Sequence, residues 1–260
     1  MKNRTIALIT DFGLADAYVG AMKGVILSIV PSTTIVDITH DVLPQKIDQA
    51  AYLLWSSFKF FPKGTIFVCV IDPGVGSERK ILCVETDDYL FLAPDNGILK
   101  YIFHHYNKAD VFEVSNEKYF ADDISSTFHG RDIFAPVAAH LADGVSPSKL
   151  GDALTPEFGA EWFNTIDPGK KGTYRGKVLH IDRFGNLITD FMFENEVKSK
   201  LSLNAGTHKI INYFSNYAEA TGHPFMIRGS SKLLEVSLRN NNAANFLRAN
   251  VNQKLLLFVE

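Results

Sequence analysis

An aspartate and an arginine frame a short glycine-rich turn that follows a predicted buried strand. The apolar run 65–69 predicts the strand, which leads into Asp72, the turn 73–76 and Arg79. In open α/β sheets, ligands bind at the carboxyl ends of strands, and glycines let the backbone approach a ligand closely. The pattern therefore predicts a site carboxylate with a permanent cation in reach. A Pro-Gly turn with a surface ion pair is the structural alternative, and this segment alone does not separate the two.

Four further polar clusters follow predicted strands or precede a predicted helix. They are residues 10–13 with Asp16, residues 39–41, residues 93–97 and residues 126–132. Asp132 is equally suited to be the N-cap of the helix that follows, a role worth about 1 kcal/mol. Because the carboxyl ends of parallel strands meet at one edge of a sheet, the five clusters together predict a pocket there.

Carboxylates and histidines at this density also fit a metal site, as in two-metal phosphoesterases. The chain has no pair of histidines or cysteines at ligand spacing, however, and strand-end carboxylates also bind sugar hydroxyls. We therefore expect no metal and no other cofactor. A metallophosphoesterase, which a chelator would inactivate, is kept as an alternative.

The composition is that of an ordinary globular protein. The 260 residues are 46% hydrophobic and 21% charged, which allows one large domain or two smaller ones. The net charge is −3 and no Lys/Arg cluster stands out, so we expect neither nucleic acid nor an anionic membrane as a partner. Cys69 and Cys83 lie in apolar runs and are interpreted as small buried side chains. No segment approaches a membrane-spanning length or a secretion signal, so the expected location is the cytoplasm.

The first part of the chain alternates strands and helices, the pattern of an α/β domain with a largely parallel sheet. Strands are expected at 6–9, 34–38, 66–71, 81–85, 90–92 and 111–114, and helices at 18–30, 47–61, 98–105 and 133–143.

After a linker at 167–172 the pattern changes to short β-like runs. These lie at 174–182, 187–193, 209–214, 224–228, 233–238 and 254–259, with turns at 183–186 and 204–206. They predict a smaller β-barrel or sandwich. We expect an N-terminal α/β domain over residues 1–165 and a C-terminal β-barrel domain over residues 172–260.

Taken together and in order, the motifs resemble those of the S-adenosyl-L-methionine hydroxide adenosyltransferases, the hydrolytic relatives of the fluorinase and chlorinase enzymes. The residues that carry the resemblance are 10–13, 71–76 with Arg79, 93–97, 128–132 and 181–186, followed by 230–231 and 239–240. Five ordered motifs over nearly the whole chain are far more specific than any one of them.

The resemblance implies a homotrimer that holds its substrate between neighbouring subunits. It implies attack of water or hydroxide on C5′ of S-adenosylmethionine, which yields adenosine and L-methionine. Asp72, Arg79 and His129 match the family residues that flank the nucleophile. Asp11 matches the ribose-binding aspartate, and Asp16 matches an acidic residue near the methionine end.

The resemblance also implies substrate contacts in the second domain. Asp182 and Ser231 match positions that hold the methionine amine and carboxylate. Lys232 stands where the family has an arginine for this carboxylate, and a lysine lacks the bidentate fork. The remaining expected substrate contacts, mostly with adenine, are Phe128, Phe184, Asn186 and the backbone around Arg239 and Asn241.

The expected chemistry suits a dry pocket, since hydroxide and a sulfonium lose their charges as they react. Asp72 and His129 are each suited to accept a proton, and the sequence leaves open which of them does. Halide-using relatives lack this Asp–His pair, which favours hydrolysis. Gly130 leaves space that a halide could use, so a halide-dependent adenosyl transferase stays an alternative. A non-catalytic adenosine- or S-adenosylmethionine-binding module would not need Asp72, Arg79 and His129 together.

Overall fold

The structure is a computed structural model, which describes residues 4–106, 108–155, 162–197 and 199–260. The chain falls into two compact units, over residues 1–161 and 162–260. The strands of the first unit are β1 (Thr5–Thr10), β2 (Thr34–Thr39), β3 (Ile66–Val70), β4 (Ile81–Glu85), β5 (Leu90–Pro94), β6 (Asp110–Glu113) and β7 (Ala153–Leu154). Its helices are α1 (Tyr18–Ile29), α2 (Ile47–Ser57), α3 (Lys100–His105) and α4 (Ala135–Ala142), with the short turns η1 (Phe58–Phe60), η2 (Glu117–Tyr119), η3 (Gly130–Phe134) and η4 (Pro147–Lys149).

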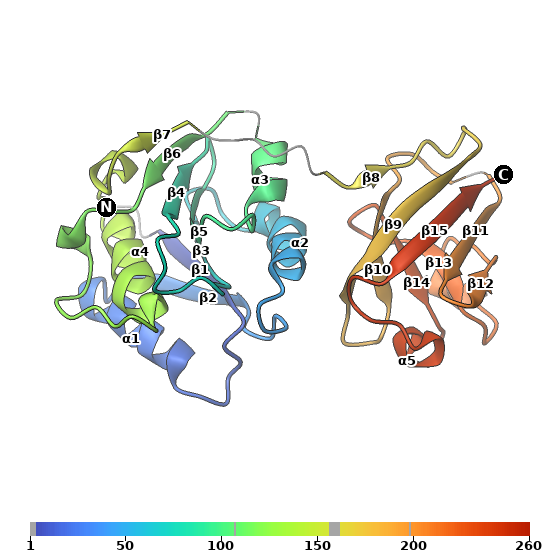
Figure 1. Ribbon diagram of the computed structural model, residues 1–260, viewed down its shortest axis with the longest axis horizontal. Helices are drawn as coiled ribbons and strands as arrows, with labels where there is room; N and C mark the ends of the chain where they lie inside the picture. Colours follow the sequence, from blue (N-terminus) through green and yellow to red (C-terminus); the bar gives the residue numbers. More distant parts are fainter. Residues whose placement is uncertain (1–3, 107, 156–161, 198) are drawn as a thin grey trace. The chain divides into compact units, whose positions relative to one another are not determined.

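The seven strands form one sheet in the order β2-β1-β3-β5-β4-β6-β7 (Figure 1). Strands β2, β1, β3 and β5 are parallel neighbours, whereas β4 runs antiparallel to β5 and β6, and β7 antiparallel to β6. The expected α/β domain with a largely parallel sheet is confirmed. The carboxyl ends of β1, β2 and β3 meet at one edge.

Helices cover both faces of the sheet, which explains why β3 is apolar at every position. On one face, α1 and α4 pack against Leu8 and Val68. On the other face, the ring of Phe67 stacks on Phe91 with centroids 5.1 Å apart, and Phe58 after α2 meets both rings edge-on. Core packing on both sides thus fixes the strand ends from which the polar clusters emerge.

The helix predicted over 133–143 begins earlier than expected, with the π-helical turn η3, and His129 precedes that turn. Asp132 therefore lies inside the turn, and its predicted role as an N-cap is wrong. Its buried carboxylate instead accepts the backbone N–H of Ser125 at 2.9 Å. It thereby folds the preceding loop back onto η3. The helix predicted over 47–61 ends at Ser57, where the shorter turn η1 takes over.

The second unit is a nearly closed β-barrel, as expected. Its elements are β8 (Asn164–Thr165), β9 (Gly172–Ile181), β10 (Leu187–Met192), β11 (Leu201–Ala205), β12 (His208–Ile210), η5 (Tyr217–Glu219), β13 (Phe225–Arg228), β14 (Leu233–Ser237), α5 (Ala243–Leu247) and β15 (Lys254–Val259). The strand order is β12-β11-β15-β9-β10-β14-β13, and β8 pairs with β10. After β12, Tyr213 forms a bridge to Met226 of β13, which brings the two edge strands together.

Two sequence predictions in the barrel are wrong. The strand predicted over 209–214 ends at Ile210, because the residues beyond it turn to pair with β13. The turn predicted over 204–206 is partly strand: β11 runs to Ala205, and Gly206 makes the hairpin turn with φ of +62°. Leu201 and Leu203 belong to the barrel core, so the alternating apolar pattern of β11 is the signal that marks it.

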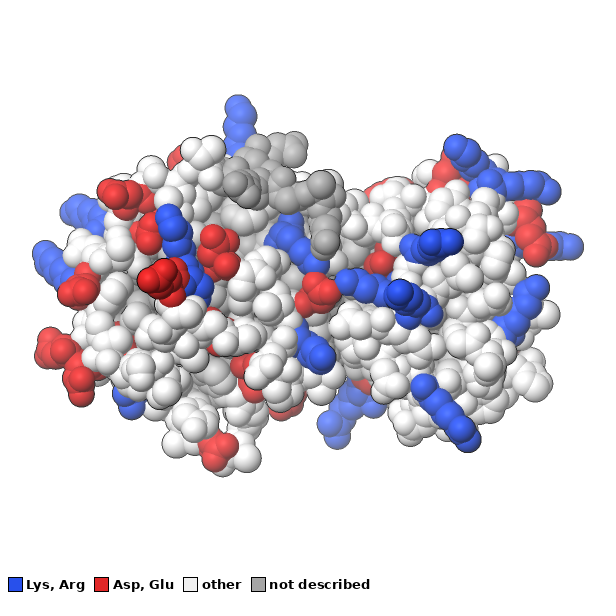
Figure 2. Space-filling view, in the orientation of Figure 1, with Lys and Arg blue, Asp and Glu red and all other residues white. Residues whose placement is uncertain are grey.

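The charges divide unequally between the two units. Residues 162–260 hold 13 Lys and Arg against 8 Asp and Glu, whereas residues 1–161 hold 13 against 21. Figure 2 shows Lys and Arg side chains over β9 and β15 of the second unit. The small net charge of the whole chain therefore hides two units of opposite sign. Within the described ranges, no helix has the length and apolarity needed to cross a membrane.

Candidate functional site

A cavity of about 400 Å³ opens where β1 and β3 end in the first unit. Asp11 and Phe12 follow β1, Asp72 follows β3, and Phe128 and His129 precede η3; all five line the cavity. Residues from distant parts of the sequence thus meet at the sheet edge that the strand-end pattern predicted.

Arg79 joins the two candidate catalytic side chains of this cavity. Its Nε donates to the two carboxylate oxygens of Asp72 at 2.9 and 3.0 Å. Its Nη2 lies 2.9 Å from Nδ1 of His129. The side chains of Asp72 and Arg79 are only 5% and 14% exposed, so the alternative of a surface ion pair is wrong. A shielded pair of this kind interacts more strongly than one in water.

The contact with Arg79 fixes the protonation of His129. A guanidinium carries only donors, so Nδ1 accepts and a neutral imidazole holds its proton on Nε2. Burial, and then the positive charge of Arg79, lower the pKa of His129 below its ordinary value of 6.5. The ring is therefore neutral around neutral pH and presents Nε2–H as a donor.

Two backbone contacts hold the turn that carries Asp72 and Arg79. The side-chain amide of Asn96 donates to the carbonyl of Ile71 at 2.8 Å, which gives the motif at 93–97 a positioning role. Gly76 has φ of +77°, and a Cβ at this residue would lie 2.5 Å from the carbonyl oxygen of Ser126. Only glycine lets this turn lie against the loop that leads to His129.

Asp11 is oriented by a neighbouring loop. Its Oδ2 accepts the backbone N–H of Gln45 at 2.9 Å. Gln45 has φ of +65°, a conformation that is uncommon outside glycine and persists where surrounding structure imposes it. Gln45 also lines the cavity, and nothing in the sequence pattern predicted this backbone contact.

Three aromatic rings form one wall of the cavity. Phe128 meets Phe12 and Tyr18 edge-on, with centroid distances of 5.8 and 5.1 Å. A Cβ at Gly130 would lie 3.2 Å from the ring of Phe128 and 3.3 Å from that of Phe12. The space expected beside Gly130 is thus bordered closely by these rings. Tyr18 was not predicted as a site residue, since its spacing fits the buried face of a helix equally well.

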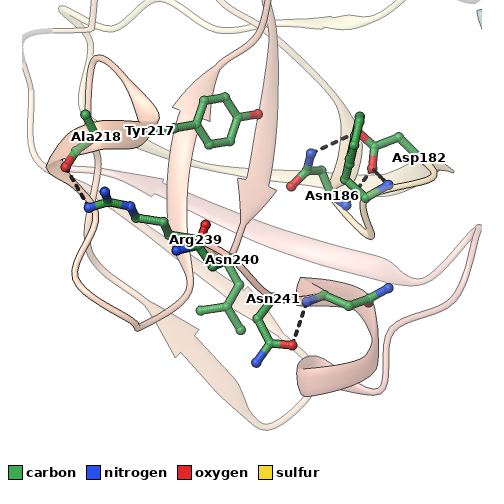
Figure 3. A pocket seen from close by; sticks show the side chains of 10 residues that line it. Asp182, Asn186, Tyr217, Ala218, Arg239, Asn240 and Asn241 are labelled. Carbon is green, nitrogen blue, oxygen red and sulfur yellow. Dashed lines mark hydrogen bonds between the residues drawn. The ribbon is translucent and has the colours of Figure 1, made fainter.

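A second cavity, of about 800 Å³, lies in the barrel and is lined by Asp182, Phe184, Asn186, Arg239 and Asn241 (Figure 3). Oδ1 of Asp182 accepts the backbone N–H groups of Phe184 and Asn186 at 2.9 and 2.8 Å, and Oδ2 accepts the side-chain amide of Asn186 at 2.8 Å. Asp182 therefore shapes the turn that presents the exposed ring of Phe184.

Arg239 holds another wall of this cavity. Its Nη1 donates to the carbonyls of Ala218 and Ala220 at 3.0 and 3.2 Å, so the side chain points at the loop around η5 (Figure 3). That loop places Tyr217 in the cavity lining. Sequence reasoning missed Tyr217; its local signal is Asn216, whose side chain accepts the N–H of Ala218 and caps η5.

Three expected binding residues lie outside both cavities. Asp16 is exposed between β1 and α1. Ser231 and Lys232 lie in the turn between β13 and β14, where Lys232 has φ of +66° and pairs with Glu194 at 2.8 Å. Across the parts of the chain that the structure describes, no three His, Cys, Asp or Glu side chains gather closely enough to hold a metal ion.

Two family models match the chain. The SAM hydroxide adenosyltransferase N-terminal domain matches residues 6–151, and the corresponding C-terminal domain matches residues 176–256. A protein of Methanocaldococcus jannaschii named (R)-S-adenosyl-L-methionine hydrolase is 35% identical over 93% of this chain and 91% of its own. A protein of the same name from Thermus thermophilus is 32% identical over 94% and 95%. A fluorinase of an Actinoplanes species is 29% identical over 72% of each chain.

The fold agrees with these matches. The crystal structure of an uncharacterized conserved protein from Thermotoga maritima superposes with a TM-score of 0.86 at 32% identity, over 97% of this chain and 99% of its own. Sequence and fold thus agree over both units, and this chain belongs to the SAM hydroxide adenosyltransferase family.

Proposed function

We propose that this protein hydrolyses S-adenosyl-L-methionine to adenosine and L-methionine. The observation that carries the proposal is the contact of Arg79 with both Asp72 and His129 at the wall of the first cavity. The Methanocaldococcus jannaschii and Thermus thermophilus proteins named as hydrolases match more than nine-tenths of the chain, whereas the Actinoplanes fluorinase matches 72% of it. Hydrolysis is therefore favoured over halide transfer.

In our mechanism, the nucleophilic water lies between Asp72 and His129. Because Nδ1 of His129 faces Arg79, the ring offers Nε2–H to the water oxygen and cannot take its proton. Asp72 keeps acceptor capacity beside its bonds to Arg79 and is the proton acceptor in this arrangement. Arg79 stabilises the negative charge that develops on the oxygen.

The bond changes need no acid. The water oxygen forms a bond to C5′, the C5′–sulfur bond breaks, and its electron pair returns to sulfur as the neutral thioether of methionine. The water loses one proton to Asp72. The aromatic wall of Phe12, Tyr18 and Phe128 presents apolar surface to the site, which favours a step in which charge is neutralised.

The substrate contacts are part of the same proposal. Asp11 binds the ribose hydroxyls, because its carboxylate lines the cavity and is already oriented by Gln45. The remaining substrate contacts we propose are Asp16, Phe128, Asp182, Phe184, Asn186, Ser231, Lys232, Arg239 and Asn241. Of these, Asp16, Ser231 and Lys232 line neither cavity. They can contact the substrate only if it extends beyond the two cavities or is bound by a neighbouring chain.

We also propose a homotrimer with substrate sites at the subunit interfaces. Large apolar side chains are exposed near cavity-lining residues in the sequence or among them: Leu14 is 68%, Leu43 46% and Phe184 77% exposed. In each unit, an exposed large apolar side chain beside a site commonly marks an interaction surface. Light scattering should give three times the chain mass of 29.0 kDa. A mass equal to one chain at working concentration would contradict the trimer.

The proposed function is tested by incubating purified protein with S-adenosylmethionine, with and without EDTA, and separating the products by chromatography. Adenosine and methionine should form in equal amounts, and EDTA should not reduce their formation. Loss of activity with EDTA and recovery with a divalent ion would favour the metal-dependent alternative. A 5′-halogenated adenosine formed on addition of halide would favour halide transfer, and binding without turnover would favour a binding module.

A further inference from the structure

A continuous chain of polar contacts lies beneath the loop that carries Asp11. Oγ1 of the buried Thr10 lies 2.8 Å from Nδ1 of the buried His40. Nε2 of His40 lies 3.0 Å from Oδ1 of Asp37, a charge contact in which the ring N–H is not aligned for a hydrogen bond. Oδ2 of Asp37 accepts from Nζ of Lys23 at 2.6 Å. The four side chains come from β1, the loop after β2, β2 itself and α1. His40 belongs to the polar cluster at 39–41, to which the proposed reaction assigns no role.

The chemistry of Asp37 fixes the direction of these contacts. Its burial opposes the charged form, but contacts with Lys23 and His40 outweigh burial and lower the pKa of Asp37 below 3.8. A carboxylate only accepts, so Nε2 of His40 holds the ring proton and Nδ1 accepts the hydroxyl proton of Thr10. Oγ1 of Thr10 then accepts the backbone N–H of Phe12 at 3.3 Å.

His40 also binds the loop through its backbone. Its carbonyl accepts the N–H of Gly13 at 2.8 Å. The two residues that follow Asp11, Phe12 and Gly13, are therefore both tied to His40, one through Thr10 and one directly. The carboxylate of Asp11 is held in turn by Gln45, from the loop that continues from His40.

We propose that the contacts linking Lys23, Asp37, His40 and Thr10 form a positioning relay for Asp11, and that this relay sets the preference of the site for ligands with ribose hydroxyls. The inference rests on the proposed function. A site built to bind a hydroxyl rejects a ligand that lacks it only when the binding group is held rigidly in place.

The relay has the composition of a catalytic triad but not its accessibility. A hydroxyl, an imidazole and a carboxylate follow one another, as in serine hydrolases. However, Thr10 is fully buried within β1 and its oxygen binds a backbone N–H. His40 is accordingly a positioning residue, since it touches the loop and not the cavity.

The relay can be broken with little change of shape. Thr10→Val removes the hydroxyl and keeps the branched side chain, while Thr10→Ser restores the hydroxyl. Thr33→Val is the matched control: Thr33 is also buried, and its hydroxyl donates to the carbonyl of Arg4 at 2.7 Å. That bond joins the starts of β1 and β2, at the opposite end from Asp11.

The measurement is calorimetric titration of each protein with adenosine and with 2′,3′-dideoxyadenosine. Native protein should bind adenosine more tightly. In Thr10→Val the ratio of the two dissociation constants should fall roughly tenfold, because Asp11 is no longer held for the hydroxyls. Thr10→Ser and Thr33→Val should keep the native ratio, although Thr33→Val also loses a buried hydrogen bond.

The outcomes separate the relay from the proposed function. A native ratio in Thr10→Val overturns the relay, and so does an equal fall in Thr33→Val, which would indicate general destabilisation. Equal affinity of native protein for the two ligands would instead overturn ribose binding by Asp11 and with it the relay, whereas hydrolysis itself is decided separately by the product chromatography. If Thr10→Val does not fold, His40→Gln is titrated in its place and should show the same fall.

Discussion

Arg79 Nη2 lies 2.9 Å from His129 Nδ1 while the same guanidinium holds Asp72. One cation therefore orients both polar groups of the proposed nucleophile site. The same contacts give the two groups opposite hydrogen-bonding roles toward the water: His129 can only donate to it, and Asp72 can only accept from it. Arg79 itself need not touch the water to be essential for this division of roles.

Activity should fall as the pH drops below 6.5, the ordinary pKa of histidine. Burial and Arg79 lower the pKa of His129, so the ring stays neutral at pH 6.5 and becomes charged only at lower pH. A charged ring carries a proton on Nδ1, which would face the Arg79 guanidinium. A profile of kcat from about pH 4.5 to 9 should show this acid limb, with circular dichroism as the check on folding. A limb centred above pH 6.5 would contradict the assignment.

Asp72→Ala and His129→Ala should lose most turnover and still bind adenosine. Loss of the proton acceptor Asp72 should cost about 10²–10⁴-fold in kcat, and loss of the hydrogen-bond donor His129 about 10²–10³-fold. Turnover is measured by product chromatography and adenosine affinity by calorimetry. Glu78→Ala, at an exposed position of the same loop, is the control. Near-native turnover in either variant would remove that residue from the mechanism.

Asp11→Asn should lose most of its preference for adenosine over 2′,3′-dideoxyadenosine. The carboxylate can accept hydrogen bonds from both ribose hydroxyls, and a carboxylate left unpaired by the deoxy ligand is costly. Calorimetric titration of the two ligands measures the preference. Asp41→Asn, an exposed residue in the loop after β2, should bind like native protein. If native protein itself shows no preference, Asp11 is a turn residue.

Asp190 should make the protein less stable as the pH rises, whereas a carboxylate in an ion pair makes a protein more stable as the pH rises. Burial raises the pKa of Asp190 from 3.8 to about 6, despite hydrogen bonds from the Lys177 backbone and Asn164. Its stabilising effect is complete below pH 3.8 and is lost as the pH rises through about 6. The free energy of unfolding of Asp190→Asn relative to native protein should therefore rise between about pH 4 and pH 8. Urea unfolding measures it, with exposed Glu196→Gln as control; a constant difference would contradict the raised pKa.

The first cavity could be predicted in outline because its residues are marked locally. Asp11 and Asp72 each follow an apolar strand, and parallel strands end at one edge. What could not be predicted is the contact between Arg79 and His129, which lie 50 positions apart in the sequence. The tautomer of His129 depends on that contact, so the roles of the two candidate bases emerge only from the structure.

The second cavity was harder to predict, because long-range contacts decide the shape of its loops. Tyr217 reaches the cavity since Arg239 holds the carbonyl of Ala218, 21 positions away. The N-cap alternative for Asp132 failed for a similar reason: its partner Ser125 precedes it by seven residues, in a loop with no regular pattern. The separation of charge between the units was hidden by the average over the chain.

The close approach of two loops depends on Gly76 having a hydrogen atom in place of a side chain. Any side chain at this position would need the room now taken by the carbonyl oxygen of Ser126. The loop that leads to His129 would then have to move away from the turn that carries Arg79, and the contact of 2.9 Å between Arg79 and His129 spans these two segments. For anyone who varies this scaffold to accept other nucleophiles, position 76 is a poor place to diversify. Phe12 and Tyr18 of the aromatic wall are better positions to vary, since neither of them takes part in the contact between Arg79 and Asp72.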